Sequence, residues 1–256
     1  MSRRRSLAIS TSVGSRHLRK FQRSGLFVPS LLMPCMFFAA FAGGLSAIAK
    51  TPHFGYPSYT SFVFIFVLFL GTCYIAAFGA SAFIADLESR FISRMMLAVP
   101  RRVAILAGLI GAGLLEAAAI VAVLFGIGLA VGMKVSGSPL QLLAIVVLAL
   151  LLNVAASLWA LGLLLRLRSS SAESLIQLPM FAVLFLAPVF VPRPLLTGWL
   201  KVAASWNPIT PLLESSRGLL VHKPVHVGLA FASVAGMIAV FLVWALLGLR
   251  KAERQP

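Results

Sequence analysis

The chain has 256 residues, of which 60% are apolar and 11% are charged, and its mean hydropathy is +1.01. Soluble globular domains contain about 45–50% apolar and about 25% charged residues, so this composition excludes a soluble domain and indicates an integral membrane protein. The net charge of +16 does not predict a nucleic-acid partner. The basic residues lie in short clusters between long apolar runs, a pattern that specifies membrane topology.

Residues 1–25 form a basic segment without the apolar core of a signal peptide, and we expect this tail to be cytosolic. A membrane-spanning helix needs about 20 mostly apolar residues. Six stretches meet or approach that length: 26–49, 61–85, 103–132, 140–165, 175–191 and 227–249. Most of the 22 Lys and Arg residues lie in 1–25, 86–102, 166–174 and 250–256, which places both termini in the cytosol. The sequence thus predicts one six-span domain at 26–249, followed by a cytosolic tail at 250–256.

The connection between the second and third spans, DLESRFISRMML at 86–97, has the pattern of a short amphipathic helix. At 100° per residue its apolar face carries Leu87, Phe91 and Met95, and its polar face carries Asp86, Arg90 and Arg94. We expect this helix to lie at the cytosolic interface. It is either a simple connector or a docking surface for another subunit.

Two polar residues lie near the middle of predicted spans: Glu116 in the third and Asn153 in the fourth. An acid inside a membrane is a candidate for substrate or proton handling, but a protonated Glu could equally hydrogen-bond to a neighbouring helix. Asn153 is expected to join helices through a hydrogen bond. Phe181 and Phe185 of the fifth span could line an apolar route or only pack. These four residues are the candidate pathway positions.

The long connection at 192–226 is too apolar for an ordinary loop. Trp199 and Trp206 have helical spacing and suit the membrane interface. Two dipeptides could begin a second short helix with proline in its first turn: Asn207-Pro208 and Thr210-Pro211. Glu214 and Arg217 then stand at i,i+3, which predicts an ion pair. Two short helices would dip into the outer leaflet, as an outer gate or as a cap that seals the bundle.

Three segments resemble the type 2 ATP-binding-cassette (ABC) transporter permeases, and in particular the small bacterial drug and lipid exporters of the daunorubicin-resistance type. The segments are DLESRFISRMMLAVPRR at 86–102, FLAPVFVP at 185–192 and WNPITPLLESSRGLL at 206–220. With the six spans, the resemblance covers nearly the whole chain. The family usually has a glycine near Ser89, which this sequence lacks.

The resemblance implies a multi-pass protein of the bacterial plasma (inner) membrane that pairs with a second permease half, identical or related, and with two ABC ATPase subunits. It implies an amphipathic connecting helix at about 7–24 and an external re-entrant helix pair at 194–220. The coupling helix at 86–97 would contact the ATPase through Asp86, Leu87, Glu88, Arg90, Phe91, Arg94 and Met95. The external gate would comprise Trp199, Trp206, Asn207, Pro208, Glu214 and Arg217.

The sequence has no Gly-Lys dipeptide and therefore no phosphate-binding loop of the Walker A type. We expect this chain to be non-catalytic, to bind no cofactor or metal, and to rely on ATP and Mg bound by the partner ATPase. The favoured function is export of a hydrophobic or amphipathic small molecule or lipid through the bilayer. The alternatives are export of a lipid-linked glycan or polysaccharide, and a membrane scaffold that transports nothing.

Overall fold

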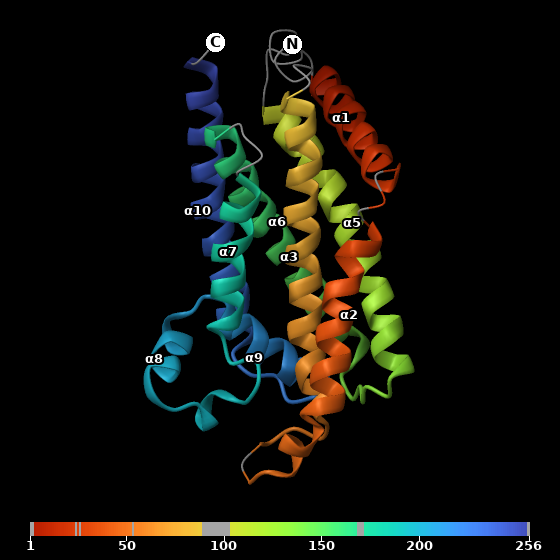
Figure 1. Ribbon diagram of the computed structural model, residues 1–256, viewed down its shortest axis with the longest axis vertical. Coiled ribbons are helices and arrows are strands. Elements are labelled where there is room, and N and C mark those ends of the chain that lie inside the picture. The colour runs from red at the N-terminus through yellow and green to blue at the C-terminus, as the bar shows by residue number, and fades with distance from the viewer. Residues whose placement is uncertain are drawn as a thin grey trace.

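The computed structural model describes residues 3–23, 25, 27–52, 54–88, 103–167 and 172–254. Within these ranges the regular secondary structure is helical, without a strand. The elements are α1 (Arg3–Arg23), α2 (Phe27–Gly44), η1 (Ser46–Lys50), α3 (Tyr59–Glu88), α5 (Val103–Ala130), α6 (Pro139–Leu167), α7 (Ala172–Phe185), η2 (Arg193–Leu195), α8 (Gly198–Trp206), α9 (Ile209–Leu220) and α10 (Val227–Arg254). The long helices run side by side along the long axis, and the start of α1 and the end of α10 lie at the same end of the bundle (Figure 1). The predicted all-α membrane fold is confirmed.

Five helices have the length and apolar composition needed to cross a membrane: Phe27–Gly44, Tyr59–Ala80, Leu106–Ala130, Pro139–Leu167 and Val227–Arg250. The sixth apolar helix is the shorter Ser174–Phe185 of α7. The fifth stretch, predicted at 175–191, ends as a helix at Phe185. Pro188 explains the early end, because proline lacks an N–H group and disfavours the helical conformation in the preceding residue.

The central helix of the bundle is α3. It contacts α2, α5, α6, α7 and α9, and 89% of its spanning segment is buried, against 17% of the spanning segments of α2 and α10. A helix that is apolar on all sides, as α3 is from Phe62 to Leu70, is expected at such a buried position. Both α2 and α10 instead expose large apolar side chains, which require lipid or another membrane subunit around them.

The N-terminal helix α1 folds back and packs against α5. The two backbones approach closely at Gly14 and Gly108: a Cβ atom at Gly108 would lie 2.5 Å from the carbonyl oxygen of Ser10. Ser10 Oγ also donates a 2.8 Å hydrogen bond to the carbonyl oxygen of Ala104. Small residues permit this kind of close helix contact within a membrane protein. The helix predicted at about 7–24 is therefore present, and it is attached to the side of α5.

Candidate functional site

The turn between α8 and α9 is held by Asn207, which is 8% exposed. Its Nδ2 donates a 2.6 Å hydrogen bond to the carbonyl oxygen of Val183 in α7. Its Oδ1 accepts a 2.8 Å hydrogen bond from the N–H group of Ile209, the first residue of α9. Of the two predicted helix starts, the structure thus has Asn207-Pro208. The carbonyl oxygen of Pro208 in turn accepts a 2.8 Å hydrogen bond from Ser233 Oγ of α10.

The two short helices α8 and α9 differ in burial. In α8 the side chains of Trp199 and Trp206 are 74% and 86% exposed, as suits tryptophans that contact a membrane interface. Almost every residue of α9 is buried, because α9 packs against α3, α6 and α10. A 2.6 Å hydrogen bond from Thr210 Oγ1 to the carbonyl oxygen of Ala204 joins the pair. The sequence predicts that both helices enter the outer leaflet and contact lipid. In the structure only α8 has exposed side chains that could make this contact.

Arg217 is the charged centre of this region and is 1% exposed. Its Nε donates a 2.9 Å hydrogen bond to the carbonyl oxygen of Phe62 in α3. Nη1 and Nη2 donate to the carbonyl oxygens of Pro188 and Val189, at 2.6 and 3.2 Å. The guanidinium carbon also lies 3.5 Å from the centre of the Phe62 ring, which is a cation–π contact. Arg217 thus ties α9 to the N-terminal end of α3 and to the non-helical segment after α7.

Burial lowers the pKa of Arg217 to about 10, so the guanidinium remains charged at neutral pH. Backbone carbonyl dipoles and the Phe62 ring stabilise the positive charge, and no carboxylate of the described residues pairs with it. The predicted ion pair between Glu214 and Arg217 is therefore wrong. Glu214 pairs instead with Arg193 Nε at 3.1 Å, because Arg217 points into the bundle while Glu214 is partly exposed.

A cavity of about 370 Å³ with both polar and apolar lining residues lies beside Arg217, and Tyr56, Arg193, Glu214 and Lys223 are among its polar ones. Burial raises the pKa of Tyr56, and the nearby Arg217 charge acts in the opposite direction. Of the predicted gate residues, Glu214 and Arg217 line this cavity, whereas Asn207 lies at the turn between α8 and α9. Trp199 and Trp206 are exposed on α8.

The buried acid Glu116 is joined to α1. It is 4% exposed, and its Oε1 lies 3.8 Å from Nε2 of His17, which is 5% exposed. His17 lies in the basic segment 1–25, outside every predicted span. A signal was nevertheless present, because Ser10, Gly14 and His17 stand at i, i+4 and i+7 and therefore share one face of α1.

The remaining candidate pathway residues make contacts within the bundle. Asn153 is 1% exposed, and its Nδ2 donates a 2.8 Å hydrogen bond to the carbonyl oxygen of Thr72, so it links α6 to α3. The ring of Phe181 lies 5.0 Å from that of Tyr74, and the ring of Phe185 lies 5.2 Å from that of Phe66. Both phenylalanines belong to an aromatic seam between α3 and α7. The structure does not bring these three residues and Glu116 together around one cavity.

Most of the predicted coupling residues, namely Arg90, Phe91, Arg94 and Met95, lie outside the described residues. Asp86, Leu87 and Glu88 form the last turn of α3, the central helix of the bundle. The coupling role of 86–97 stays a prediction.

Residues 8–221 match the family described as ABC-2 type transporter. Because the match covers most of the chain, the chain belongs to this family. It is accordingly a multi-pass membrane permease component of an ABC transporter, a class of subunit that works with ABC ATPase subunits in a membrane complex. A comparison with curated proteins gave no match.

Proposed function

We propose that this chain is one half of the permease of a bacterial ABC exporter that moves a hydrophobic or amphipathic small molecule or lipid out of the cell. A second permease half and two ATPase subunits, which bind ATP and Mg, would complete the transporter in the plasma membrane. The observation that carries the proposal is the external helix pair: α9 is buried and fixed by Arg217 and Asn207, while α8 presents tryptophans outward. Such an arrangement suits an outer gate that opens toward lipid or solvent.

The apolar interior favours an apolar cargo over a lipid-linked glycan. The central helix α3 and the seam between α3 and α7 are lined with Phe, Ile, Leu and Val side chains rather than with polar groups that would bind sugars. A scaffold without transport would need no ATPase partner. The segment that would meet this partner is the coupling helix at 86–97, which continues from α3.

Substitutions in the coupling helix test the proposal. We expect Phe91→Ala or Arg94→Glu to weaken co-purification of the ATPase, or to reduce transport per ATP hydrolysed, without preventing membrane insertion. Truncation of a central interface anchor typically costs about 2 kcal/mol or more, equivalent to a loss of about 30-fold in affinity. The measurement is ATP hydrolysis and substrate movement in reconstituted vesicles. Ser93→Ala on the polar face is the matched control, and unchanged binding and coupling in both test variants would leave 86–97 as a simple connector.

Cysteine labelling tests the orientation. In a background that lacks Cys35 and Cys73, a cysteine at Lys201 should react with a membrane-impermeant thiol reagent added outside intact cells. Lys201 is exposed in α8, so the protein itself does not prevent the reagent from reaching a cysteine at this position. A cysteine at Ser170 should react only after the membrane is opened. The opposite labelling pattern would invert the proposed topology, with the external helices on the cytosolic side.

A further inference from the structure

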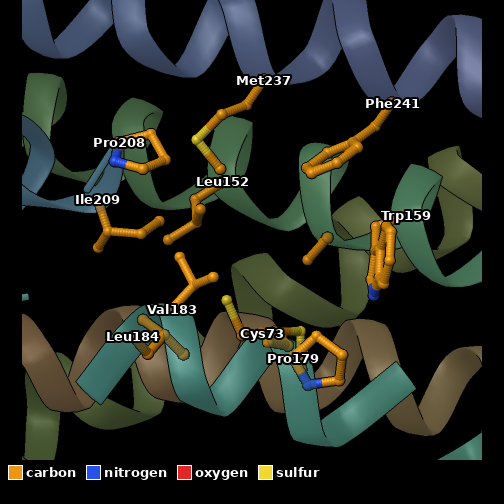
Figure 2. Close-up of a pocket in the computed structure, with 12 residues that line it drawn as sticks. Cys73, Leu152, Trp159, Pro179, Val183, Leu184, Pro208, Ile209, Met237 and Phe241 are labelled. Carbon is orange, nitrogen blue, oxygen red and sulfur yellow. The ribbon is translucent and has the colours of Figure 1, made fainter. Parts of the chain in front are cut away.

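An apolar cavity of about 200 Å³ lies between α7 and α10. Figure 2 shows α10 along one edge of the view and α7 along the opposite edge, with labelled side chains from both helices directed into the space between them. Ala156 and Trp159 of α6, Val183 of α7 and Phe241 of α10 are among its lining residues. The surface of the cavity is hydrocarbon and sulfur. An apolar cavity of about 150 Å³ stays dry and can bind benzene, so this larger cavity favours a hydrocarbon occupant over water.

The helices that flank the cavity also expose apolar side chains. Val183 and Leu178 of α7 are 37% and 67% exposed, and Val240 and Val243 of α10 are 64% and 57% exposed. A cavity between two such surfaces adjoins the hydrocarbon of the bilayer. A chain from a membrane lipid or another amphiphile can therefore enter it without crossing a polar barrier.

A stack of aromatic rings leads from this cavity toward a positive charge. The rings of Trp159 and Trp244 are nearly parallel, with centres 5.7 Å apart and planes inclined by 14°. The guanidinium carbon of Arg166 lies 3.5 Å from the centre of the Trp244 ring. Arg166 is in the last turn of α6, seven residues after Trp159, which corresponds to about 10 Å along the helix. The charge thus lies within reach of an amphiphile whose chain occupies the cavity.

Arg166 retains capacity to bind an anion. Nη1 donates to the carbonyl oxygen of Gly162 at 2.5 Å, and Nη2 donates to that of Trp244 at 2.9 Å. These bonds use two of the five N–H groups of the guanidinium, and no carboxylate among the described side chains serves as its counter-ion. The carboxylates whose side chains the structure describes, Glu116 and Glu214, pair with His17 and Arg193 instead. In addition, the indole N–H groups of Trp159 and Trp244 have no acceptor in the described part of the chain.

We propose that the cavity and Arg166 form a binding site for an anionic long-chain amphiphile. Its hydrocarbon chain occupies the space between α7 and α10, and its anionic group pairs with Arg166 at the end of α6. The charge complementarity at Arg166 selects an anionic head group over a neutral one. This inference concerns binding by the chain itself, and it holds whether or not the bound molecule is transported.

Tryptophan fluorescence can test the site directly, because the chain has four tryptophans and two of them belong to the stack. A Trp199→Phe, Trp206→Phe background leaves Trp159 and Trp244 as the reporters. The full chain is reconstituted in phosphatidylcholine vesicles that contain increasing amounts of a lipid with brominated chains, which quench tryptophan on contact. The probes are phosphatidylglycerol, which is anionic, and phosphatidylcholine with the same brominated chains.

We expect saturable quenching by the brominated phosphatidylglycerol, with half-saturation at a roughly three- to tenfold lower mole fraction than for brominated phosphatidylcholine, as a charge-assisted contact predicts. Arg166→Gln should abolish this preference, and Arg166→Lys should retain part of it. Ala156→Phe and Val183→Phe, which fill the cavity from two different walls, should each weaken the saturable quenching. Leu129→Phe, on an exposed face of α5 away from the cavity, should leave it unchanged.

Equal quenching by the two probes in the background with Arg166 intact would overturn the anionic part of the proposal. Saturable quenching that persists in both filled-cavity variants would overturn the site itself. Each variant is compared only after its elution from size-exclusion chromatography matches that of the background protein. If one filling variant fails this requirement, the other gives the result, and the Arg166 comparison is independent of both.

Discussion

Replacement of Arg217 by Ala should destabilise the folded permease by about 3 kcal/mol or more, because a buried acceptor that loses its donor costs about 1–3 kcal/mol and Arg217 donates to three carbonyl oxygens. The substitution leaves the carbonyl oxygens of Pro188 and Val189 without the guanidinium that now binds them. It also removes the contact with the Phe62 ring and creates a void beneath α9. The measurement is the thermal unfolding midpoint of the protein in detergent, read from the loss of the folded peak in size-exclusion chromatography.

Arg193→Ala is the matched control for this experiment. Arg193 lines the cavity beside Arg217, but its side chain is 41% exposed and its ion pair with Glu214 should contribute only about 0.2–1 kcal/mol. Arg217→Lys should fall between the two, since a single ammonium cannot reproduce the planar fork that reaches three separate carbonyls. Equal midpoints for Arg217→Ala and Arg193→Ala would show that the Arg217 contacts do not stabilise the fold. Export measured on a folded Arg217→Lys variant would then separate a gating role from a purely structural one.

The second large effect is expected at Glu116. Glu116→Lys would place an ammonium beside His17 inside a predicted span, with no carboxylate of the described residues near it. A charged side chain at the centre of a spanning helix costs about 2.5–3.5 kcal/mol even on the insertion scale, and an unpaired buried charge can cost about 3–5 kcal/mol. We expect a clear fall in the yield of folded protein and detachment of α1 from α5, detected as faster proteolysis after Arg16 and Arg19.

Glu116→Gln and Glu116→Leu provide the comparison. Glutamine keeps a polar group next to His17, and leucine replaces it with an apolar side chain of similar size, so neither introduces an uncompensated charge. Both variants should fold with yields close to that of the unchanged protein. Tolerance of Glu116→Lys at the same level as Glu116→Gln would mean that water reaches this position, which would favour the pathway role over the structural one. Loss of transport in a well-folded Glu116→Gln variant would support that same role.

Hydropathy was sufficient to predict the spans because each spanning helix is a long apolar run. The ends were predicted less well where prolines and glycines decide them. The segment from Leu186 to Val191 is apolar enough to extend the fifth span, yet Pro188 ends the helix and the carbonyl groups that follow turn toward Arg217. Apolarity measures preference for the membrane and does not by itself measure helix propensity.

The contacts of the site were harder to predict, because its polar groups bind distant backbone. Glu214 and Arg217 satisfy the i,i+3 rule, but that rule describes an isolated helix in water. In the folded chain Arg217 reaches a carbonyl 155 positions away, at Phe62, and Glu214 turns to Arg193. Likewise, no periodicity in α5 indicates that α1 will return to place His17 beside Glu116. These partnerships depend on the packing of whole helices.

The burial and continuity of α3 have a mechanical consequence. Its 30 residues form one uninterrupted helix of about 45 Å, longer than the hydrocarbon thickness of a typical bilayer, which is about 30 Å. Prolines occur within α2 and α7, at Pro34 and Pro179, but α3 contains none. One end of this rod continues into the segment proposed to meet the ATPase, and the other carries Phe62, to which Arg217 is bound. A movement of the Glu88 end would therefore be transmitted to α9 as a displacement of the whole helix, with no proline kink between the two ends to absorb it.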